Sequence, residues 1–277
     1  IGYPLTRLHA VQNMSRTYAV CEISSFQAES LWRFRCEALL WTNFDEDHLD
    51  RYASMREYFE AKWRLVERLE GTTLIVGESV ANAARQFGYE LPSFTQVISA
   101  KAPSADAETT ETGAFRRPPQ RENYLIARAF WESQGLSLEA LEDTAEHFEL
   151  PLHRLEFVAS VSGVDFFNDS KATNFQASLA AMDTFRRPVF WIGGGCAKGG
   201  DITGFAETAA SRVAAGYVLG EVAAGLVEVF SRRGRPCRHF ESMEQAVFAA
   251  CADAAKIPGS VVLLSPGFAS FGLFSGY

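Results

Sequence analysis

VDFFNDSKATNFQASLA, residues 164–180, changes from a strand pattern to a helix pattern across one long polar segment. Its first four residues form a β-prone apolar run, whereas helical spacing begins after residue 174. A connecting turn needs only about two or three polar residues, but NDSKATN (168–174) supplies an acid, a base, two hydroxyls and two amides. The segment therefore either caps the helix, with Thr173 or Asn174 as the N-cap by residue type, or holds a charged ligand.

The sequence after residue 150 continues this alternation of apolar runs and helical patterns. Strands are predicted at 164–167, 188–194, 215–220, 237–240 and 260–266, and helices at 174–184, 203–215, 221–233 and 242–255. Such alternation predicts an α/β fold, in which a parallel sheet carries helices on both faces.

Three polar clusters stand at the carboxyl ends of predicted strands in this half. They are NDSKATN (168–174), GGGCAKGGD (193–201) and SPGFASFG (265–272). Ligands of parallel α/β sheets bind beyond the carboxyl ends of the strands, so the three clusters together favour a functional cleft over helix capping alone. The glycine-rich cluster lacks the G-x-G-x-x-G spacing because Lys198 takes the place of the third glycine, and the sequence contains no P-loop signature.

The first half has a different texture, and a domain boundary is predicted near residue 150, where Pro151 separates a helix pattern from a strand-like run. The two domains would then be 1–149 and 150–277. In the first, strands are predicted at 18–23, 38–41 and 72–76, and helices at 54–69, 123–134 and 138–147. The segment 92–121 contains many small, polar and acidic residues, which predicts an exposed hairpin or loop.

Three residues of the first half form a candidate metal site. Glu22 ends the first predicted strand, His48 lies in the loop NFDEDHLDR after the second, and Lys62 follows on a predicted helix. A glutamate and a histidine at the ends of neighbouring parallel strands could share one Mg²⁺ ion, which takes one or two protein ligands together with phosphate oxygens and water. The alternative is structural: a lone histidine on an acidic surface loop, and an exposed lysine whose stem lies along the apolar face of its helix.

The composition restricts the class of protein. Of the 277 residues, 47% are hydrophobic and 22% are charged, as in ordinary globular domains. A net charge of -8 argues against nucleic acid as a partner. The five cysteines form no C-x-x-C pair, which indicates free thiols in a reducing cytosol. No apolar run approaches the ~20 residues of a membrane span, and the absence of an initiator methionine suggests a part of a longer protein.

Seven motifs, in this order, resemble the Mur ligase family. They are CEISSFQAE (21–29), TNFDEDHLDR (42–51), EAKWRL (60–65), LPLHRLEFV (150–158), NDSKATN (168–174), GGGCAKGGD (193–201) and LLSPGFASFGLF (263–274). The resemblance spans the whole chain, is weakest over 77–121, and is strongest to the branch that adds D-glutamate. It implies part of a central ATPase domain with a parallel sheet, followed by a Rossmann-like C-terminal domain.

The resemblance also implies an ATP-dependent amide ligase of peptidoglycan precursor synthesis. ATP would phosphorylate the carboxylate of UDP-N-acetylmuramoyl-L-alanine, and the amine of D-glutamate would attack the acyl phosphate. Carried over by motif, the resemblance implies Mg²⁺ or Mn²⁺ held by Glu22, His48 and a carbamylated Lys62, with catalytic roles for Lys62, His48 and Lys171. It implies nucleotide contacts from Arg154, Asp169, Lys171, Gln120 and Asn123. It implies substrate contacts from Ser24, Ser25, Gln27, Thr173, Lys198, Ser270 and Tyr277.

Two parts of the family pattern are missing from this sequence, namely the P-loop and the UDP-binding domain. We therefore expect this chain alone to be inactive. The complete protein is expected to be a cytoplasmic monomer that binds small-molecule substrates but neither nucleic acid nor a membrane. Two alternatives stay open. One is a non-catalytic relative that kept the cleft as a binding module. The other is an amide ligase of the folate or polyglutamate type, which ISSFQ and NDSKATN together disfavour.

Overall fold

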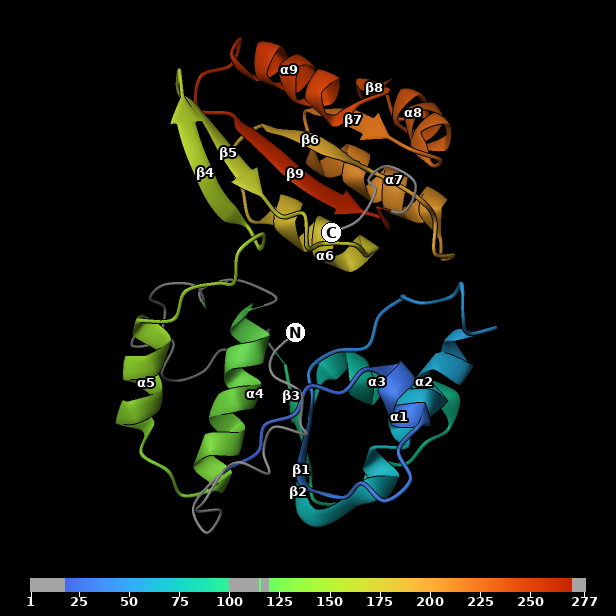
Figure 1. The fold of residues 1–277 in the computed structure, drawn as a ribbon, viewed down its shortest axis with the longest axis vertical. Helices are drawn as coiled ribbons and strands as arrows, with labels where there is room; N and C mark the ends of the chain where they lie inside the picture. Colours follow the sequence, from blue (N-terminus) through green and yellow to red (C-terminus); the bar gives the residue numbers. More distant parts are fainter. Residues whose placement is uncertain (1–17, 100–114, 116–119, 271–277) are drawn as a thin grey trace.

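The computed structural model describes residues 18–99, 115 and 120–270, which contain two sheets (Figure 1). The small-sheet unit, residues 18–99 and 120–146, has the strand order β1-β2-β3, and the large-sheet unit, residues 156–270, has the order β4-β5-β9-β6-β7-β8. The small-sheet unit consists of α1 (Ser25–Glu29), β1 (Cys36–Trp41), α2 (Met55–Trp63), the 3-10 turn η2 (Val66–Arg68), β2 (Leu69–Gly77), α3 (Glu78–Phe87), β3 (Thr95–Ile98), α4 (Gln120–Ser133) and α5 (Leu138–Glu146). The large-sheet unit consists of β4 (Glu156–Val161), β5 (Val164–Asn168), α6 (Phe175–Asp183), β6 (Val189–Gly194), α7 (Ile202–Arg212), β7 (Ala215–Leu219), α8 (Ala223–Arg232), β8 (Cys237–His239), α9 (Met243–Ala254) and β9 (Val261–Gly267).

The small sheet is covered on both faces because side chains alternate along its strands. All its strands run parallel. Leu74 and Val76 of β2 point into an aromatic core shared with α2 and α3, where Phe59 is completely buried. Ile75, between them, packs against Ile126 of α4 on the opposite face. The small-sheet unit therefore has one aromatic core and one smaller aliphatic contact.

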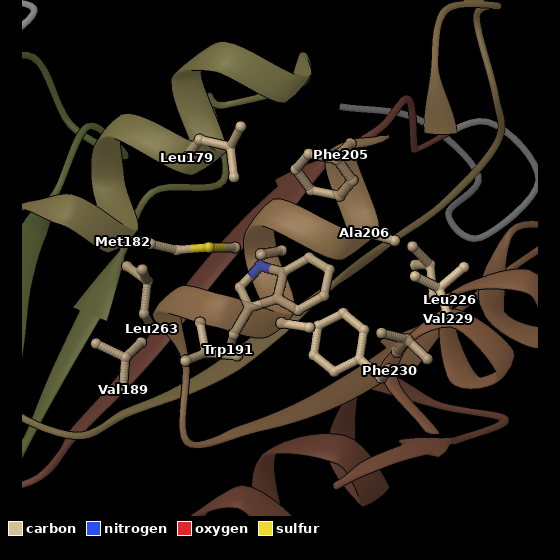
Figure 2. Close-up of a cluster of buried hydrophobic side chains, with 14 of the residues drawn as sticks. Leu179, Met182, Val189, Trp191, Phe205, Ala206, Leu226, Val229, Phe230 and Leu263 are labelled. Carbon is tan, nitrogen blue, oxygen red and sulfur yellow. The ribbon is translucent and has the colours of Figure 1, made fainter. Parts of the chain in front are cut away.

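The large sheet is organised around β6, whose six residues are all buried. Trp191 faces α6, α7 and α8 (Figure 2), whereas Phe190 and Ile192 face α9. The Trp191 ring stacks on Phe230 with centroids 5.9 Å apart, and its indole N–H donates to the carbonyl of Ser265 at 2.7 Å. Edge strand β4 is antiparallel to β5, and the other strand pairs are parallel. Helices therefore cover both faces of a mainly parallel sheet.

Most of the predicted elements correspond to observed ones. Every strand and helix predicted after residue 150 overlaps an element of the same type. In the first half, the strands at 38–41 and 72–76 correspond to β1 and β2, and the helix at 54–69 corresponds to α2 followed by η2. α3 and β3 are absent from the prediction. α3 nonetheless carries apolar residues at helical spacing (Val80, Ala81, Ala84 and Phe87), so a local signal was present there, whereas the four residues of β3 give too short a pattern.

The strand predicted at 18–23 is wrong. This segment has no regular secondary structure, and Tyr18 and Val20 are 57% and 92% exposed. A β-prone run becomes a strand only where a neighbouring strand pairs with its N–H and C=O groups, and no strand of the described ranges pairs with it. Glu22 therefore does not end a strand, contrary to the sequence prediction.

The connection between the units runs from the end of α5 at Glu146 to the start of β4 at Glu156. The predicted boundary near residue 150 lies within this connection, and the division into domains 1–149 and 150–277 stays a prediction. Much of the loop predicted at 92–121 lies outside the described residues, although β3 occupies its beginning. In the ranges that the structure describes, no helix combines the length and apolar character required to cross a membrane.

Candidate functional site

Three loops meet at the carboxyl ends of β5, β6 and β9, and backbone hydrogen bonds join them. The N–H of Gly267 donates to the carbonyl of Ala172 at 2.8 Å, and the N–H of Cys196 donates to the carbonyl of Ala269 at 2.8 Å. Gly195 permits the second contact, because its φ is 143° and a Cβ there would lie 2.1 Å from the carbonyl oxygen of Ala269. The three polar clusters are therefore brought to one edge of the sheet, as the sequence predicts.

The polar segment 168–174 does more than cap a helix. Asn174 is the N-cap of α6, and its side-chain oxygen accepts from the N–H of Ala177 at 2.9 Å. The amide nitrogen of the same side chain donates to Asp47 of the small-sheet unit at 3.4 Å. Both interpretations of the segment therefore hold at Asn174, which caps its helix and contacts the other unit.

A cleft that is open to solvent lies between the two units. Its lining residues come from the loop after β1 and from all three loops of the large sheet: Glu46, Asp47, Leu49, Thr173, Asn174, Phe175, Lys198, Gly199, Gly200, Gly267 and Phe268. Lys198 Nζ lies 3.5 Å from Asp47 Oδ1, and each side chain is 20% exposed. The cleft thus contains two of the predicted substrate contacts, Thr173 and Lys198, opposite an acidic loop.

Asp169 is a buried carboxyl at the end of β5. It is 7% exposed and accepts hydrogen bonds from the N–H of Leu155 at 3.1 Å and from the hydroxyl of Ser265 at 2.8 Å. Burial raises the pKa of Asp169 to about 6, although these two bonds and the positive charge of Arg154 act in the opposite direction. Asp169 and Arg154 therefore interact, while Arg154 and Lys171 are both exposed on the surface beside it.

His48 lies among aromatic rings in the loop after β1. Its backbone is left-handed, with φ 58°, and its N–H donates to the Asp47 carboxylate at 2.8 Å. Its ring stands edge-on to Phe26 and Tyr58, with centroids 4.8 Å and 6.0 Å away. Lys62 Nζ lies 5.2 Å from the centre of the same Tyr58 ring. Tyr58 therefore connects His48 to Lys62, and the structure brings these two predicted residues together.

Lys62 is partly buried on α2. Burial lowers the pKa of its ammonium group below the usual value, and the Asp47 carboxylate opposes this change. A lysine with a lowered pKa supplies more of the neutral amine, which is the nucleophilic form.

The ISSFQ motif forms the start of α1. The Ser24 hydroxyl accepts from the N–H of Gln27 at 3.3 Å, and the Gln27 side-chain oxygen accepts from the N–H of Ser24 at 2.8 Å, which completes a capping box. Ser25 is 2% exposed, whereas Glu22 is exposed in the extended segment before the helix. Two of the predicted substrate contacts therefore already satisfy each other as helix caps.

One acidic side chain fastens α1 to the His48 loop. Glu29 at the end of α1 accepts from the Tyr52 hydroxyl at 2.6 Å and forms an ion pair with Arg51. The Tyr52 bond and then the Arg51 bond hold the pKa of Glu29 below its usual value. The backbone N–H groups of Arg51 and Tyr52 also donate to the carbonyl of His48. The position of His48 thus depends on side-chain contacts around a short loop.

The remaining predicted site residues are more dispersed. Gln120 and Asn123 share the first turn of α4, where the Asn123 amide donates to the Gln120 oxygen at 3.3 Å. Within the described ranges, no hydrogen bond or ion pair joins either residue to Asp169. Ser270 directly follows the bridge between Cys196 and Ala269, on the β9 side of the loops. Tyr277 lies outside the described residues.

Asp47 is a charged cleft residue that sequence reasoning did not select. Its carboxylate reaches His48, Asn174 and Lys198. In the sequence it belongs to the acidic run before His48, which has the character of a solvated surface loop. Only the approach of the second unit distinguishes it from its acidic neighbours.

Glu22 and His48 are residue types that a hard divalent cation takes as ligands, although no contact among the described residues joins the two side chains. No set of three histidine, cysteine or acidic side chains in the described part of the chain is arranged to hold a metal. Mg²⁺ commonly takes only one or two protein ligands in phosphate-transfer sites. The chemistry of a carboxylate and an imidazole therefore agrees with such a site, in which a nucleotide supplies the other oxygens.

The sequence matches two described families. Residues 1–118 match the Mur ligase middle domain, and residues 153–268 match the Mur ligase, glutamate ligase domain. The chain is 35% identical over 282 residues to the UDP-N-acetylmuramoylalanine–D-glutamate ligase of Nitratidesulfovibrio vulgaris, strain DP4, and 31% identical over 297 residues to that of Koribacter versatilis. These alignments cover 100% of this chain but 61% and 64% of the two relatives.

Solved structures with the same fold include more distant ligases. A crystal structure of MurF from Acinetobacter baumannii matches with a TM-score of 0.64 at 15% identity, over 88% of this chain and 58% of that chain. Escherichia coli FolC in complex with DHPP and ADP matches with a TM-score of 0.57 at 21% identity, over 84% of this chain and 58% of that chain. MurF ligase from Thermotoga maritima in complex with ADP matches with a TM-score of 0.56 at 15% identity, over 83% and 58%. At these identities the likeness establishes the fold.

Proposed function

The chain belongs to the Mur ligase family, and on this premise we propose that the complete protein joins D-glutamate to UDP-N-acetylmuramoyl-L-alanine in an ATP-dependent reaction. The chain spans 61% and 64% of the length of the two relatives named above, so the activity is proposed for the whole protein. One observation carries the proposal: Thr173 and Lys198, on strand-end loops of the large sheet, share a cleft with the loop that holds His48.

The first step transfers the γ-phosphoryl group of ATP to the substrate carboxylate, giving an acyl phosphate and ADP. Asp169, Arg154 and Lys171 would contact the nucleotide from the large-sheet unit, and Gln120 and Asn123 from α4. Two solved structures with this fold contain ADP, which supports a nucleotide at this fold.

A divalent metal, Mg²⁺ or Mn²⁺, would be held by Glu22 and His48, and when bound it neutralises charge on the phosphate oxygens. The neutral amine of Lys62 would combine with carbon dioxide and release a proton, leaving a carbamate anion near His48. The lowered pKa of Lys62 supports this modification. Ser24, Ser25 and Gln27 would line the region of the reacting carboxylate.

In the second step, the D-glutamate amine attacks the acyl phosphate. The amide bond forms, inorganic phosphate leaves, and the nitrogen gives up a proton. Lys198 would hold a carboxylate of the amino acid through a charge-assisted hydrogen bond, with Thr173, Ser270 and Tyr277 as further contacts. The electrostatic role of the loops is thus to bring two anionic substrates together in one cleft. We propose a cytoplasmic, monomeric enzyme of peptidoglycan precursor synthesis, and hence of cell-wall formation.

The test uses the protein encoded by the complete gene. With ATP, UDP-N-acetylmuramoyl-L-alanine and D-glutamate present, it should release phosphate and form the amide, while L-glutamate and D-alanine should be poor substrates. Lys198→Ala should raise the KM for D-glutamate about 10- to 100-fold, because a hydrogen bond to a charged group contributes about 1.5–3 kcal/mol. The KM for ATP should change little.

Exposed Lys256, which pairs with Asp253 far from the cleft, provides a matched control as Lys256→Ala. Equal losses of D-glutamate and ATP affinity in Lys198→Ala would remove Lys198 from the amino-acid site. Turnover with a different amino acid would identify another amide ligase of the superfamily. Binding without turnover by the complete protein would identify a non-catalytic relative.

A further inference from the structure

The Asp47 carboxylate occupies a shared position between the two units. On the large-sheet side, Asp47 Oδ1 lies 3.5 Å from Lys198 Nζ, and Asp47 Oδ2 accepts from the Asn174 amide at 3.4 Å. On its own side, Asp47 Oδ1 accepts from the N–H of His48 at 2.8 Å. Three donors therefore converge on one carboxylate inside the cleft.

The groups that hold Asp47 are those suited to a carboxylate ligand. An ammonium group and an amide N–H₂ bind a free carboxylate with the same geometry as they bind an aspartate side chain. Two carboxylates cannot both form a full-strength ion pair with the ammonium group of Lys198, because the two negative charges repel each other. Since the N–H of His48 fixes Asp47 to its own loop, the side chain is a tethered competitor for any anion that enters.

We propose that Asp47 is a positioning residue that holds Lys198 and Asn174 in place of the amino-acid carboxylate until the substrate displaces it. This inference rests on the proposed function, since it takes the displacing anion to be the carboxylate of the incoming amino acid. Displacement would transfer Lys198 from Asp47 to the substrate, so Asp47 lowers affinity for the amino acid while it keeps the empty cleft ordered.

The neighbouring acidic residues do not meet the same conditions. Glu46 also crosses the cleft, but it accepts from the backbone N–H of Asp201 at 3.2 Å rather than from a cation. Asp50 is exposed, and no ion pair in the described ranges includes it. Among these carboxylates, Asp47 alone pairs with the lysine proposed to read the substrate, so the effect should be specific to it.

The experiment measures the KM for D-glutamate in the complete protein with Asp47→Asn, which keeps the shape and removes the charge. We expect the KM to fall about 2- to 5-fold, in keeping with a partly screened ion pair. Asp50→Asn, which also removes one negative charge from this loop, should leave the KM for D-glutamate unchanged. In a Lys198→Ala background, Asp47→Asn should have no effect on the KM for D-glutamate, because the ammonium group for which Asp47 and the substrate compete has been removed. Urea midpoints of all variants establish that they are folded.

A KM for D-glutamate that stays the same or rises in Asp47→Asn overturns the inference while the proposed function stands. If the wild-type protein does not use D-glutamate, the proposed function fails instead. The holding contact is then tested by solution X-ray scattering of the protein without substrates. Asp47→Asn, but not Asp50→Asn, should increase the radius of gyration by loosening the two units, and an unchanged radius refutes the contact.

Discussion

In the large-sheet unit, the residues proposed to bind ligands stand on loops that leave buried strands, whereas in the small-sheet unit they stand around aromatic rings on a helix and a loop. Thr173 and Lys198 follow β5 and β6, whose ends are joined to β9 through backbone hydrogen bonds. His48 and Lys62 are instead positioned by contacts with Phe26 and Tyr58.

This difference indicates how each half of the site tolerates change. Apart from Gly195, where a Cβ would clash with the carbonyl of Ala269, the backbone hydrogen bonds between strand ends do not depend on side-chain identity. The large-sheet loops are therefore fixed mainly by the packing of the sheet beneath them. Ring contacts do depend on identity, so the small-sheet half is sensitive to single substitutions near His48. Damage to the large-sheet core should therefore appear as lost stability, and damage to the small-sheet site should appear as lost activity.

The largest expected effect is on stability, from Trp191→Ala. Trp191 is fully buried and both stacks on Phe230 and donates to Ser265. Removing a buried tryptophan leaves a cavity, so the free energy of unfolding should fall by about 3–5 kcal/mol in urea denaturation. Trp32 is 83% exposed, and Trp32→Ala should change the free energy by less than about 0.5 kcal/mol. Similar losses in the two variants would contradict the role assigned to the β6 core.

The next effect is on activity, from Lys62→Ala. If Lys62 becomes a carbamate beside the metal, the variant of the complete protein should lose up to about 100-fold in kcat, as for other groups that orient metal ligands. Its urea midpoint should change little, in contrast to Trp191→Ala. Added short carboxylic acids should restore part of the rate by replacing the missing anion. A loss of rate without any such rescue would favour a structural role for the Lys62 stem.

The smallest effect is a pH dependence at the end of β5. The pKa of Asp169 is raised to about 6 by burial, so the folded protein binds its proton more tightly than the unfolded chain does. The stability that Asp169 contributes is then complete below pH ~4 and is lost as the pH rises to about 6. Asp169→Asn should remove this loss and gain about 3 kcal/mol at most relative to wild type as the pH rises between these values.

Asp165, on the same strand, provides a control of opposite sign. Its hydrogen bond with Arg187, 2.8 Å long, lowers the pKa of Asp165. Its contribution to stability is therefore present above pH ~4 and is lost as the pH falls below that value. Urea titrations across pH ~2–8 should show slopes of opposite sign against wild type, between about pH 4 and 6 for Asp169→Asn and below about pH 4 for Asp165→Asn. Parallel slopes would mean that burial does not control the titration of Asp169.

The fold could be predicted well in the second half because its signals are local. Apolar runs followed by polar loops and helical spacing recur there, and each run lies in a buried strand. The run at 18–23 has the same β-prone composition, but no strand within the described residues lies beside it, and local propensity cannot supply a partner. β3, with only four residues, carries a weak pattern, whereas the helical spacing of α3 is present in the sequence and could have been predicted.

The candidate site divides in the same way. The sequence by itself determined that polar clusters follow the strands of a parallel sheet, because strand period, turn residues and glycine requirements are encoded within a few neighbouring residues. Tertiary structure alone decided that Asp47, rather than Glu46 or Asp50, pairs with Lys198, and that Lys62 is buried beside Tyr58. The pairing of Asp47 with Lys198 joins residues more than a hundred positions apart in the sequence. The burial of Lys62 depends on the packing of several elements, and no local sequence pattern contains either relationship.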